Sequence, residues 1–361
     1  MTKVAIPGGN AVQFHTIADG GCRSYLVACP DTGIAAVIDP LLGQVDRMLG
    51  NIAREGLTLR YVIETHTHAD HFSASRAVRT RTGAKIVMHA QSPANDIDLR
   101  VEDGHQLVLG KLRLRVLHTP GHTSDSICLV CEDRVFTGDT LLIGGTGRTD
   151  LPSGDPEALH DSLFSKLLLL PDEMLIFPAH DYANKGQSTI CAEKADNRRL
   201  QHPERNDFVA MMRALDLAMP THLTEALRTN ISGGVTVRQL LEDAAASTPF
   251  MAMDELVRRL GERRNDFVVL DVRERDAWSR SRVPGARHLP RGQLELKVDE
   301  TFPDPEIEIL TVCEFGKVST LAAATLRQLG FRRAVAFDGG MKAWREAGYP
   351  VEEGDDPALM I

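Results

Sequence analysis

The chain has 361 residues, of which 43% are hydrophobic and 25% are charged, and this length and composition predict a globular protein of two domains. The formal net charge of −9 argues against a nucleic-acid partner that is held through many phosphate contacts. No apolar stretch reaches membrane-spanning length and the N-terminal residues lack the apolar core of a signal peptide, so we expect a cytoplasmic protein with no membrane partner.

Three histidines and an aspartate lie close together in the sequence, directly after an apolar run that ends at Ile63. The apolar run predicts a buried strand. Because alternate residues of an extended segment point the same way, His66 and His68 can face one point, and Asp70 and His71 follow in the turn. Neutral imidazole is the commonest metal ligand in proteins, so this cluster predicts a metal site.

Three more candidate ligands follow, each at a point where a predicted strand gives way to a loop. They are His122 in a Pro-Gly-His turn, Asp139 in a Gly-Asp pair and His180 after an apolar run. Loops on a rigid sheet are where catalytic groups collect. The recurrence of ligand types in this setting indicates a metal-dependent enzyme rather than a polar loop with chance histidines.

In this order, the four motifs resemble the signature of the metallo-β-lactamase superfamily, over roughly residues 1–220. The resemblance implies a four-layer αββα sandwich with the metal at one edge of its two sheets. We expect this domain, with a helical extension and the linker, to occupy residues 1–245, and a second domain to occupy residues 246–361.

The second part of the chain alternates apolar strands with helices, which predicts an α/β domain with a parallel sheet and helices on both faces. The apolar run at 307–312 ends directly on Cys313, and a helix is expected from about Ser319. The amides of such a loop and the N-terminus of the helix favour the thiolate, which is the reactive form of cysteine. Cys313 is therefore a candidate catalytic nucleophile.

The segments at 270–274, 283–286 and 338–344 together resemble the rhodanese family, over roughly residues 250–355. That family carries sulfane sulfur as a cysteine persulfide, and Cys313 matches the position of its nucleophile. The loop around the nucleophile contains Glu314, Phe315, Gly316, Lys317, Val318 and Ser319.

Two features of this second resemblance concern its substrate. The loop from Cys313 to Val318 has the short length that the family uses for sulfur, whereas longer loops in relatives suit phosphate. Val318 stands where the family usually has arginine, and Arg282 stands where it usually has histidine. The identity of the sulfur donor is therefore left open.

The segments around Asp139, Arg148 and His180 closely resemble the persulfide dioxygenases of the ETHE1-like group. This resemblance implies one Fe(II) per chain, held by His66, His122 and Asp139. Two histidines and one carboxylate leave open positions for O2 and substrate. The groups that would orient ligands and substrate are His68, Asp70, His71 and His180, and those that would contact glutathione are Arg148 and Tyr182.

The implied reaction converts glutathione persulfide, O2 and water into glutathione and sulfite. The rhodanese domain would move sulfur between thiosulfate or sulfite and glutathione, through a persulfide on Cys313. One domain would handle persulfide sulfur and the other would oxidise it, so the two resemblances support each other. The expected partners are small molecules, and a homo-oligomer is compatible with the sequence.

Two alternatives stay open. A glyoxalase-II-like hydrolase of glutathione thioesters, with two zinc ions and an accessory rhodanese domain, would use the same metal motifs. The C-terminal domain could also be a binding module without catalysis, since Val318 departs from the family pattern. Cys128 and Cys131 have a CxxC spacing, but residues three apart on a strand face opposite sides, so we interpret them as buried inert thiols.

Overall fold

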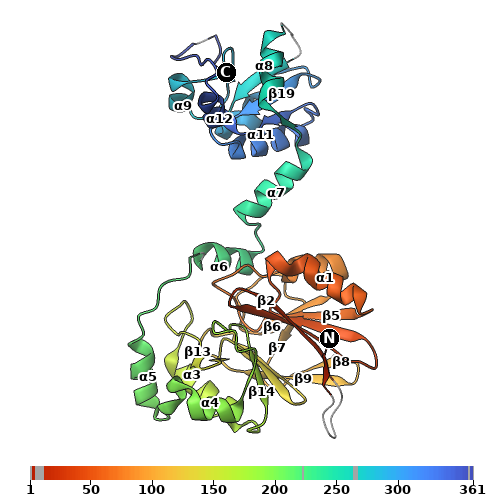
Figure 1. The fold of residues 1–361 in the computed structure, drawn as a ribbon, viewed down its shortest axis with the longest axis vertical. Coiled ribbons are helices and arrows are strands. Elements are labelled where there is room, and N and C mark those ends of the chain that lie inside the picture. The colour runs from red at the N-terminus through yellow and green to blue at the C-terminus, as the bar shows by residue number, and fades with distance from the viewer. Residues whose placement is uncertain (1, 5–11, 222, 263–266, 357, 361) are drawn as a thin grey trace. The chain divides into compact units, whose positions relative to one another are not determined.

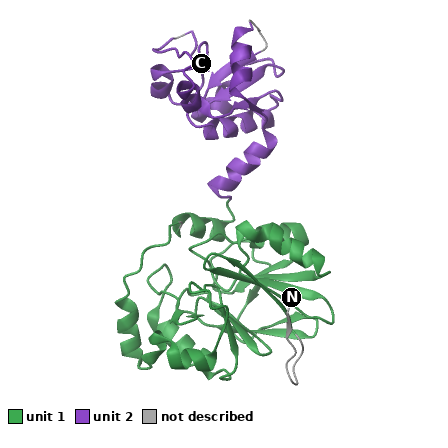
Figure 2. Ribbon diagram, viewed as in Figure 1, with its two compact units in different colours: residues 1–234 green, residues 235–361 purple. Residues whose placement is uncertain are grey.

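The computed structural model describes residues 2–4, 12–221, 223–262, 267–356 and 358–360, and the chain divides into two compact units, 1–234 and 235–361 (Figure 2). The expected division after residue 245 falls within helix α7 (Val237–Ser247), which packs on α11 (Lys317–Gln328) and belongs to the second unit. As a boundary between folding domains, residue 245 stays a prediction.

The first unit contains two large sheets, which Figure 1 shows with helices on their outer faces. One sheet has the order β1-β2-β3-β4-β5-β6-β7, with bounds Thr2–Val4, Val12–Asp19, Cys22–Ala28, Ile34–Ile38, Thr58–Ile63, Lys85–His89 and Leu99–Val101. The other has the order β15-β14-β11-β10-β9-β8, with bounds Ser188–Thr189, Leu175–Pro178, Arg134–Gly138, Ile127–Cys131, Leu112–His118 and Gln106–Leu109.

Short elements and helices complete this unit. A small ribbon is formed by β12 (Leu141–Leu142) and β13 (Gly145–Thr146). The helices are α1 (Val45–Arg54), α2 (Ser75–Thr82), α3 (Pro156–Phe164), α4 (Ile190–Asp196), α5 (Arg205–Arg213) and α6 (Leu223–Ser232), with 3-10 turns η1 (Leu42–Gln44), η2 (Leu167–Leu169) and η3 (Arg198–Gln201).

The layers follow from where the apolar side chains are buried. The facing sides of the two sheets share one core, with an aromatic cluster of Tyr25, Phe136 and Phe177 at its centre. The outer side of the first sheet packs on α1 and α2, and the outer side of the second packs on α3, α4 and α5. The predicted αββα sandwich is therefore confirmed.

Strand β10 shows how the period-2 pattern assigns side chains to layers. Cys131 lies in the core between the sheets, whereas Cys128 faces the helices, and both are fully buried. Burial raises the pKa of Cys128 to about 11 and that of Cys131 to about 12. The two thiols are therefore on opposite faces and unreactive, as their position on a strand predicts.

The second unit has one sheet of five parallel strands in the order β16-β20-β19-β17-β18, which confirms the predicted α/β class. Their bounds are Phe250–Met251, Val335–Phe337, Glu308–Val312, Phe267–Asp271 and Arg287–His288. Apolar cores lie on both faces of the sheet. The remaining elements are α8 (Met253–Gly261), α9 (Arg275–Arg280), η4 (Arg291–Gln293), α10 (Leu294–Thr301) and α12 (Gly340–Glu346).

Among the described residues, no helix is both long enough and apolar enough to cross a bilayer.

Candidate metal and thiol sites

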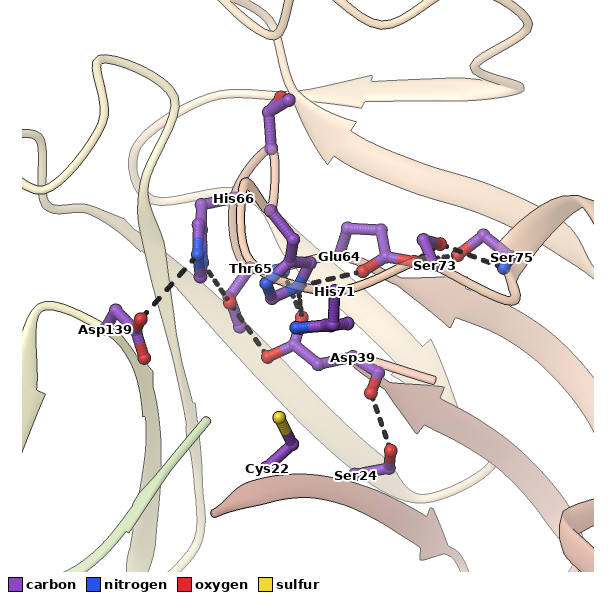
Figure 3. Close-up of polar contacts among 12 residues, drawn as sticks. Cys22, Ser24, Asp39, Glu64, Thr65, His66, His71, Ser73, Ser75 and Asp139 are labelled. Atoms are coloured by element: carbon purple, nitrogen blue, oxygen red, sulfur yellow. Dashed lines mark hydrogen bonds and ion pairs between the residues drawn. The ribbon is translucent and has the colours of Figure 1, made fainter. Parts of the chain in front are cut away.

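Three predicted ligands converge where three strands of the first unit end. His66 follows β5, His122 follows β9 and Asp139 follows β11, and all three side chains are buried. Their ligating atoms lie within 4.8 Å of one another. The Oδ2 atom of Asp139 is 4.0 Å from His66 Nε2 (Figure 3). The same oxygen is 3.6 Å from His122 Nε2. This spacing brings two imidazoles and one carboxylate to a single point.

The hydrogen bonds of the His66 and His122 imidazoles involve Nδ1 and leave both Nε2 atoms available to bind a metal ion. His122 Nδ1 lies 2.8 Å from the carbonyl oxygen of Arg148, an acceptor, so this nitrogen carries the proton and Nε2 keeps its lone pair. His66 Nδ1 lies 3.0 Å from Thr65 Oγ1, and His66 Nε2 is buried without a hydrogen-bond partner among the described residues. An unpaired buried nitrogen of this kind is suited to act as a ligand of a metal cation.

The surroundings of His66 and Asp139 favour the neutral imidazole and the ionised carboxylate that bind a metal cation. Burial, together with the neighbouring His68 and His122, lowers the pKa of His66 well below its ordinary value, so this ring is neutral near pH 7. Burial alone raises the pKa of Asp139, but the charge of His180 and its hydrogen bond hold that pKa below the usual range. His180 Nδ1 lies 2.7 and 2.9 Å from the two carboxylate oxygens.

A second group of ligand types borders the first. Asp70, His71 and His180 are joined by Cys22, and the ligating atoms of these four residues lie within 4.8 Å of one another. His180 Nε2 is 2.7 Å from Asp70 Oδ2 and 3.4 Å from Cys22 Sγ. Burial raises the pKa of Cys22, but hydrogen bonds to His180 and His71 outweigh burial and lower it to about 6. The candidate site thus contains a thiol that favours the thiolate.

His68 belongs to a third group and does not join His66. Its Nε2 lies 3.1 Å from Asp39 Oδ1 and 3.1 Å from Glu64 Oε2, and all three side chains are buried. Asp39 also accepts hydrogen bonds from the amide and hydroxyl of Thr65, at 2.7 and 2.8 Å (Figure 3). His68 is therefore held by two carboxylates beside the three-residue centre.

A cavity of about 590 Å³ opens onto Asp139, His122 and His180. Arg148 borders it, but its guanidinium already forms a two-fold pair with Asp150, at 2.6 and 2.6 Å. The same guanidinium donates to the carbonyls of Ala218 and Leu217, at 2.7 and 3.1 Å. Arg148 therefore supports the outer wall of the cavity in this structure.

Two further residues line the same cavity. The ring of Tyr182 is 77% exposed and stacks on His180, with ring centroids 5.5 Å apart. Arg199 is half-buried and donates to Thr146 and to the Gly147 carbonyl, and it pairs with no carboxylate among the described residues. A cation without a counter-ion at the wall of a cavity suits a ligand that carries a carboxylate.

The thiol site lies at the end of β19, where Cys313 is only 3% exposed. Its sulfur is 3.3 Å from Ser319 Oγ, and the loop reaches α11 through Gly316, whose φ is +83°. The amide of Met341 donates to the Cys313 carbonyl at 2.8 Å and so ties the loop to the start of α12. This strand–loop–helix arrangement matches the predicted one.

A second cavity of about 590 Å³ opens onto Cys313 and Val318. Four arginines line it, namely Arg273, Arg280, Arg291 and Arg345. Glu314 pairs with Arg345 and Arg273, and these partners lower its pKa. The cations around the thiol therefore come from outside the loop, and Val318 adds an apolar side chain to the same wall.

Arg282, the second departure from the rhodanese pattern, is packed away from this cavity. Its guanidinium lies 4.1 Å from the ring centroid of Trp278 and donates to the Gly354 carbonyl at 2.6 Å. It is buried, so its role in the described structure is packing.

Comparisons with known proteins give a match for each of the two units. The Metallo-beta-lactamase superfamily matches residues 17–180 and the Rhodanese-like domain matches residues 252–347. The chain is 37% identical, over 215 residues, to human "Persulfide dioxygenase ETHE1, mitochondrial", a match that covers 59% of this chain and 84% of the relative. This chain belongs to the ETHE1 family.

Solved structures extend the match beyond the ETHE1 domain. ETHE1 from Myxococcus xanthus is 41% identical with a TM-score of 0.60, over 62% of this chain and 100% of that one. A metallo-beta-lactamase from Staphylococcus aureus is 24% identical with a TM-score of 0.60, over 91% of this chain and 99% of that one, and shows likeness of fold. A hydroxyacylglutathione hydrolase of Polaromonas is also similar, at 36% identity over 48% of this chain and 67% of the relative.

The sequence analysis missed several residues that surround the centre formed by His66, His122 and Asp139. Asp39 directly follows β4, precedes a proline and has a positive φ of 49°, so a carboxylate after a strand end was a signal in principle. Glu64 lies two residues before His66, the first histidine of the cluster. Nothing in the sequence around Cys22 indicated a role in the site. An isolated β-bridge between the backbones of Cys22 and His180 brings it there. Arg199 likewise reaches the cavity from a distant 3-10 turn.

Proposed function

We propose that the first unit is an Fe(II)-dependent persulfide dioxygenase, which oxidises glutathione persulfide with O2 and water to glutathione and sulfite. The observation that carries this proposal is the convergence of His66, His122 and Asp139 within 4.8 Å, in a chain of the ETHE1 family. Two imidazoles and one carboxylate on one face are the donor set that non-haem Fe(II) oxygenases use.

The residues fit that ion, and the unpaired Nε2 of buried His66 is the observation that tests the fit. His66 and His122 would donate neutral nitrogens, and Asp139 would supply the negative charge. Bound iron supplies open positions at which O2 and a persulfide sulfur can be brought together. His180 holds the Asp139 carboxylate through Nδ1, which fixes the orientation of that ligand.

We assign the glutathione part of the substrate to the adjoining cavity. A volume of about 590 Å³ is within the range of sites for small ligands. Arg148 and Tyr182 are the contacts that the family resemblance suggests, and the unpaired charge of Arg199 adds a third candidate for a carboxylate. Asp70, His71 and His68 would orient ligands and substrate around the ion.

The second unit is proposed to transfer sulfane sulfur through Cys313. The Cys313 thiolate would attack the outer sulfur of thiosulfate, the S–S bond would break, and sulfite would leave with the bonding electrons. A glutathione thiolate would then take the sulfur from the Cys313 persulfide, which gives glutathione persulfide and restores the thiolate. The arginines that line the cavity are suited to these anionic donors and acceptors.

A second candidate is a hydrolase of glutathione thioesters with two zinc ions. The grouping of Asp70, His71 and His180 beside the first centre favours it, because these are ligand types for a further ion. Anaerobic purification with metal analysis separates the two candidates. We expect one iron per chain and O2 uptake with glutathione persulfide, whereas two zinc ions and hydrolysis of a glutathione thioester would support the alternative.

A further inference from the structure

Helix α6 lies outside the stretch that matches the metallo-β-lactamase superfamily, which ends at residue 180, yet it contacts the loop that carries the histidine cluster. Its buried face presents Ala226 and Asn230, four residues apart, toward the rest of the first unit. Asn230 is 8% exposed. A buried amide needs hydrogen-bond partners, so the groups that it contacts are informative.

All three partners of the Asn230 amide are backbone groups of the histidine loop. Its Nδ2 donates to the carbonyl oxygens of His68 and His71, each at 2.9 Å. Its Oδ1 accepts the amide N–H of Ser73 at 3.0 Å. One side chain thus connects three points along the turn that follows His66.

Arg76 forms hydrogen bonds with the C-terminal turn of α6, in which Asn230 lies. Its guanidinium donates to the carbonyls of Thr229, Asn230 and Ile231, at 3.2, 3.1 and 3.3 Å. These carbonyls belong to the last turn of α6, whose partial negative charge interacts favourably with a cation. Arg76 lies in the first turn of α2, the helix that follows the histidine loop, so Asn230 and Arg76 together join α6 to that loop and to α2.

We propose that Asn230 is a positioning residue for the metal-binding loop, and that it sets the direction in which the cluster presents its side chains. Among the described residues, the backbone from His66 to His71 has no hydrogen bond to other backbone groups, whereas Phe72 and Ala74 at the end of the loop pair with Leu42 and Pro40. Removal of the amide leaves the His68 and His71 carbonyls short of a donor and frees the turn. The inference rests in part on the proposed metal ligands.

The test uses the full-length protein with two variants and a matched control. Asn230→Leu keeps the size of the side chain and removes its three hydrogen bonds. Asn230→Asp keeps the shape and the acceptor for Ser73, but replaces the donor with an acceptor. Thr229→Val is the control, because the buried Thr229 hydroxyl has no hydrogen-bond partner among the described residues.

The first measurement is amide hydrogen exchange of the segment 66–73 in metal-free protein, which does not depend on the proposed function. We expect exchange about tenfold faster in Asn230→Leu and unchanged in Thr229→Val. Equal exchange in the parent and both variants would overturn the proposal. If Asn230→Leu does not fold, Asn230→Asp provides the same comparison.

The second measurement is the affinity for Fe(II), by competition with a chelator, together with the EPR spectrum of the nitrosyl adduct. We expect an affinity about tenfold weaker in Asn230→Leu and an altered spectrum, since groups that orient ligands have effects of this size. Faster exchange with unchanged affinity and spectrum would contradict a positioning role. A parent protein that binds no Fe(II) would refute the proposed function. The exchange measurement would still show whether Asn230 restrains the backbone of the histidine loop.

The Asn230→Asp variant adds a pH readout that a space-filling role would not produce. At high pH its carboxylate faces two carbonyl oxygens, whereas at low pH the protonated acid can donate to one of them. The iron affinity of this variant, divided by that of the parent, should therefore fall as pH rises. A ratio independent of pH would contradict the proposed hydrogen bonds.

Discussion

At the scale of single residues, Asp139 is where the candidate centre is held together. It faces His66 and His122 on one side, and it takes both contacts from His180 Nδ1 on the other. Order in the sequence was enough to pick out these four residues. Their convergence required the fold, because they follow strands of two different sheets.

Asp139→Ala should lose iron and O2 uptake, because the two remaining imidazoles supply no negative charge and only two donors. Sulfur transfer should survive, since Cys313 lies in the other unit with its own loop. Metal analysis and oxygen-electrode traces check this expectation. Full O2 uptake by an iron-free variant would contradict the assignment of Asp139 as an iron ligand.

Cys22 should react as a thiolate at unusually low pH. Hydrogen bonds to His180 and His71 lower its pKa to about 6, so the thiolate fraction should rise through pH 6 rather than near 9. Alkylation of metal-free protein, followed by mass spectrometry across a pH series, measures this midpoint. Cys191, which is exposed, is the control on the same molecule. A midpoint for Cys22 close to that of Cys191 would contradict the described contacts.

Arg148 should affect substrate binding more than chemistry. Loss of a charge-assisted contact typically costs about 1.5–3 kcal/mol, so Arg148→Ala should raise the KM for glutathione persulfide by tenfold or more. Asp150→Asn distinguishes direct contact from support of the wall, because Asp150 only holds Arg148 in place. Equal kinetics in the parent and Arg148→Ala would place the glutathione site elsewhere.

At the scale of elements, apolar patterns and turn residues predicted the strands that lead to the candidate ligands and to Cys313, and the parallel second sheet, whereas the αββα sandwich was implied by the family resemblance. They could not predict α6 as part of the site, since nothing local in its sequence indicates that Asn230 contacts a loop some 160 positions earlier. The same holds for Cys22, which reaches His180 only through a bridge between two segments. Long-range pairing is a property of the folded chain and leaves no periodic signal.

Gly147 shows how closely the elements approach at the centre. A Cβ on this residue would lie 2.0 Å from the Asp139 carbonyl oxygen and 2.9 Å from the His122 side chain. Gly147→Ala should therefore displace both ligands, and overpacking of this kind costs about 1–3 kcal/mol of unfolding free energy. Thermal unfolding and iron content measure the effect. Gly145→Ala is the matched control, because a Cβ there meets nothing within 4 Å, and equal behaviour of the two variants would contradict the described packing.

At the scale of the whole molecule, the reactions proposed for the two units share one compound, glutathione persulfide. The first is proposed to consume glutathione persulfide, and the second, which matches the Rhodanese-like domain, is proposed to produce it from thiosulfate and glutathione. Each unit has its own reactive group and its own cavity of about 590 Å³. We therefore expect a freely diffusing intermediate to connect the two proposed activities.

Cys313→Ser separates the two activities in the intact chain. A serine hydroxyl is a poor nucleophile near neutral pH and cannot store a persulfide, so transfer from thiosulfate should be abolished. Oxidation of added glutathione persulfide should stay near the parent rate, since His66, His122 and Asp139 are untouched. Thiosulfate plus glutathione should then support O2 uptake in the parent and not in the variant.

Two contrary results in this experiment carry different meanings. Residual transfer from thiosulfate would show that Cys313 is not the carrier, even though it ends β19 and precedes α11. Loss of oxidation of added persulfide would show that the iron unit depends on Cys313, and that diffusion alone does not connect the sites. Cys191→Ser, which removes an exposed thiol of the first unit, controls for effects of thiol loss in general. Only a variant that keeps oxidation and loses transfer supports two independent centres joined by a shared intermediate.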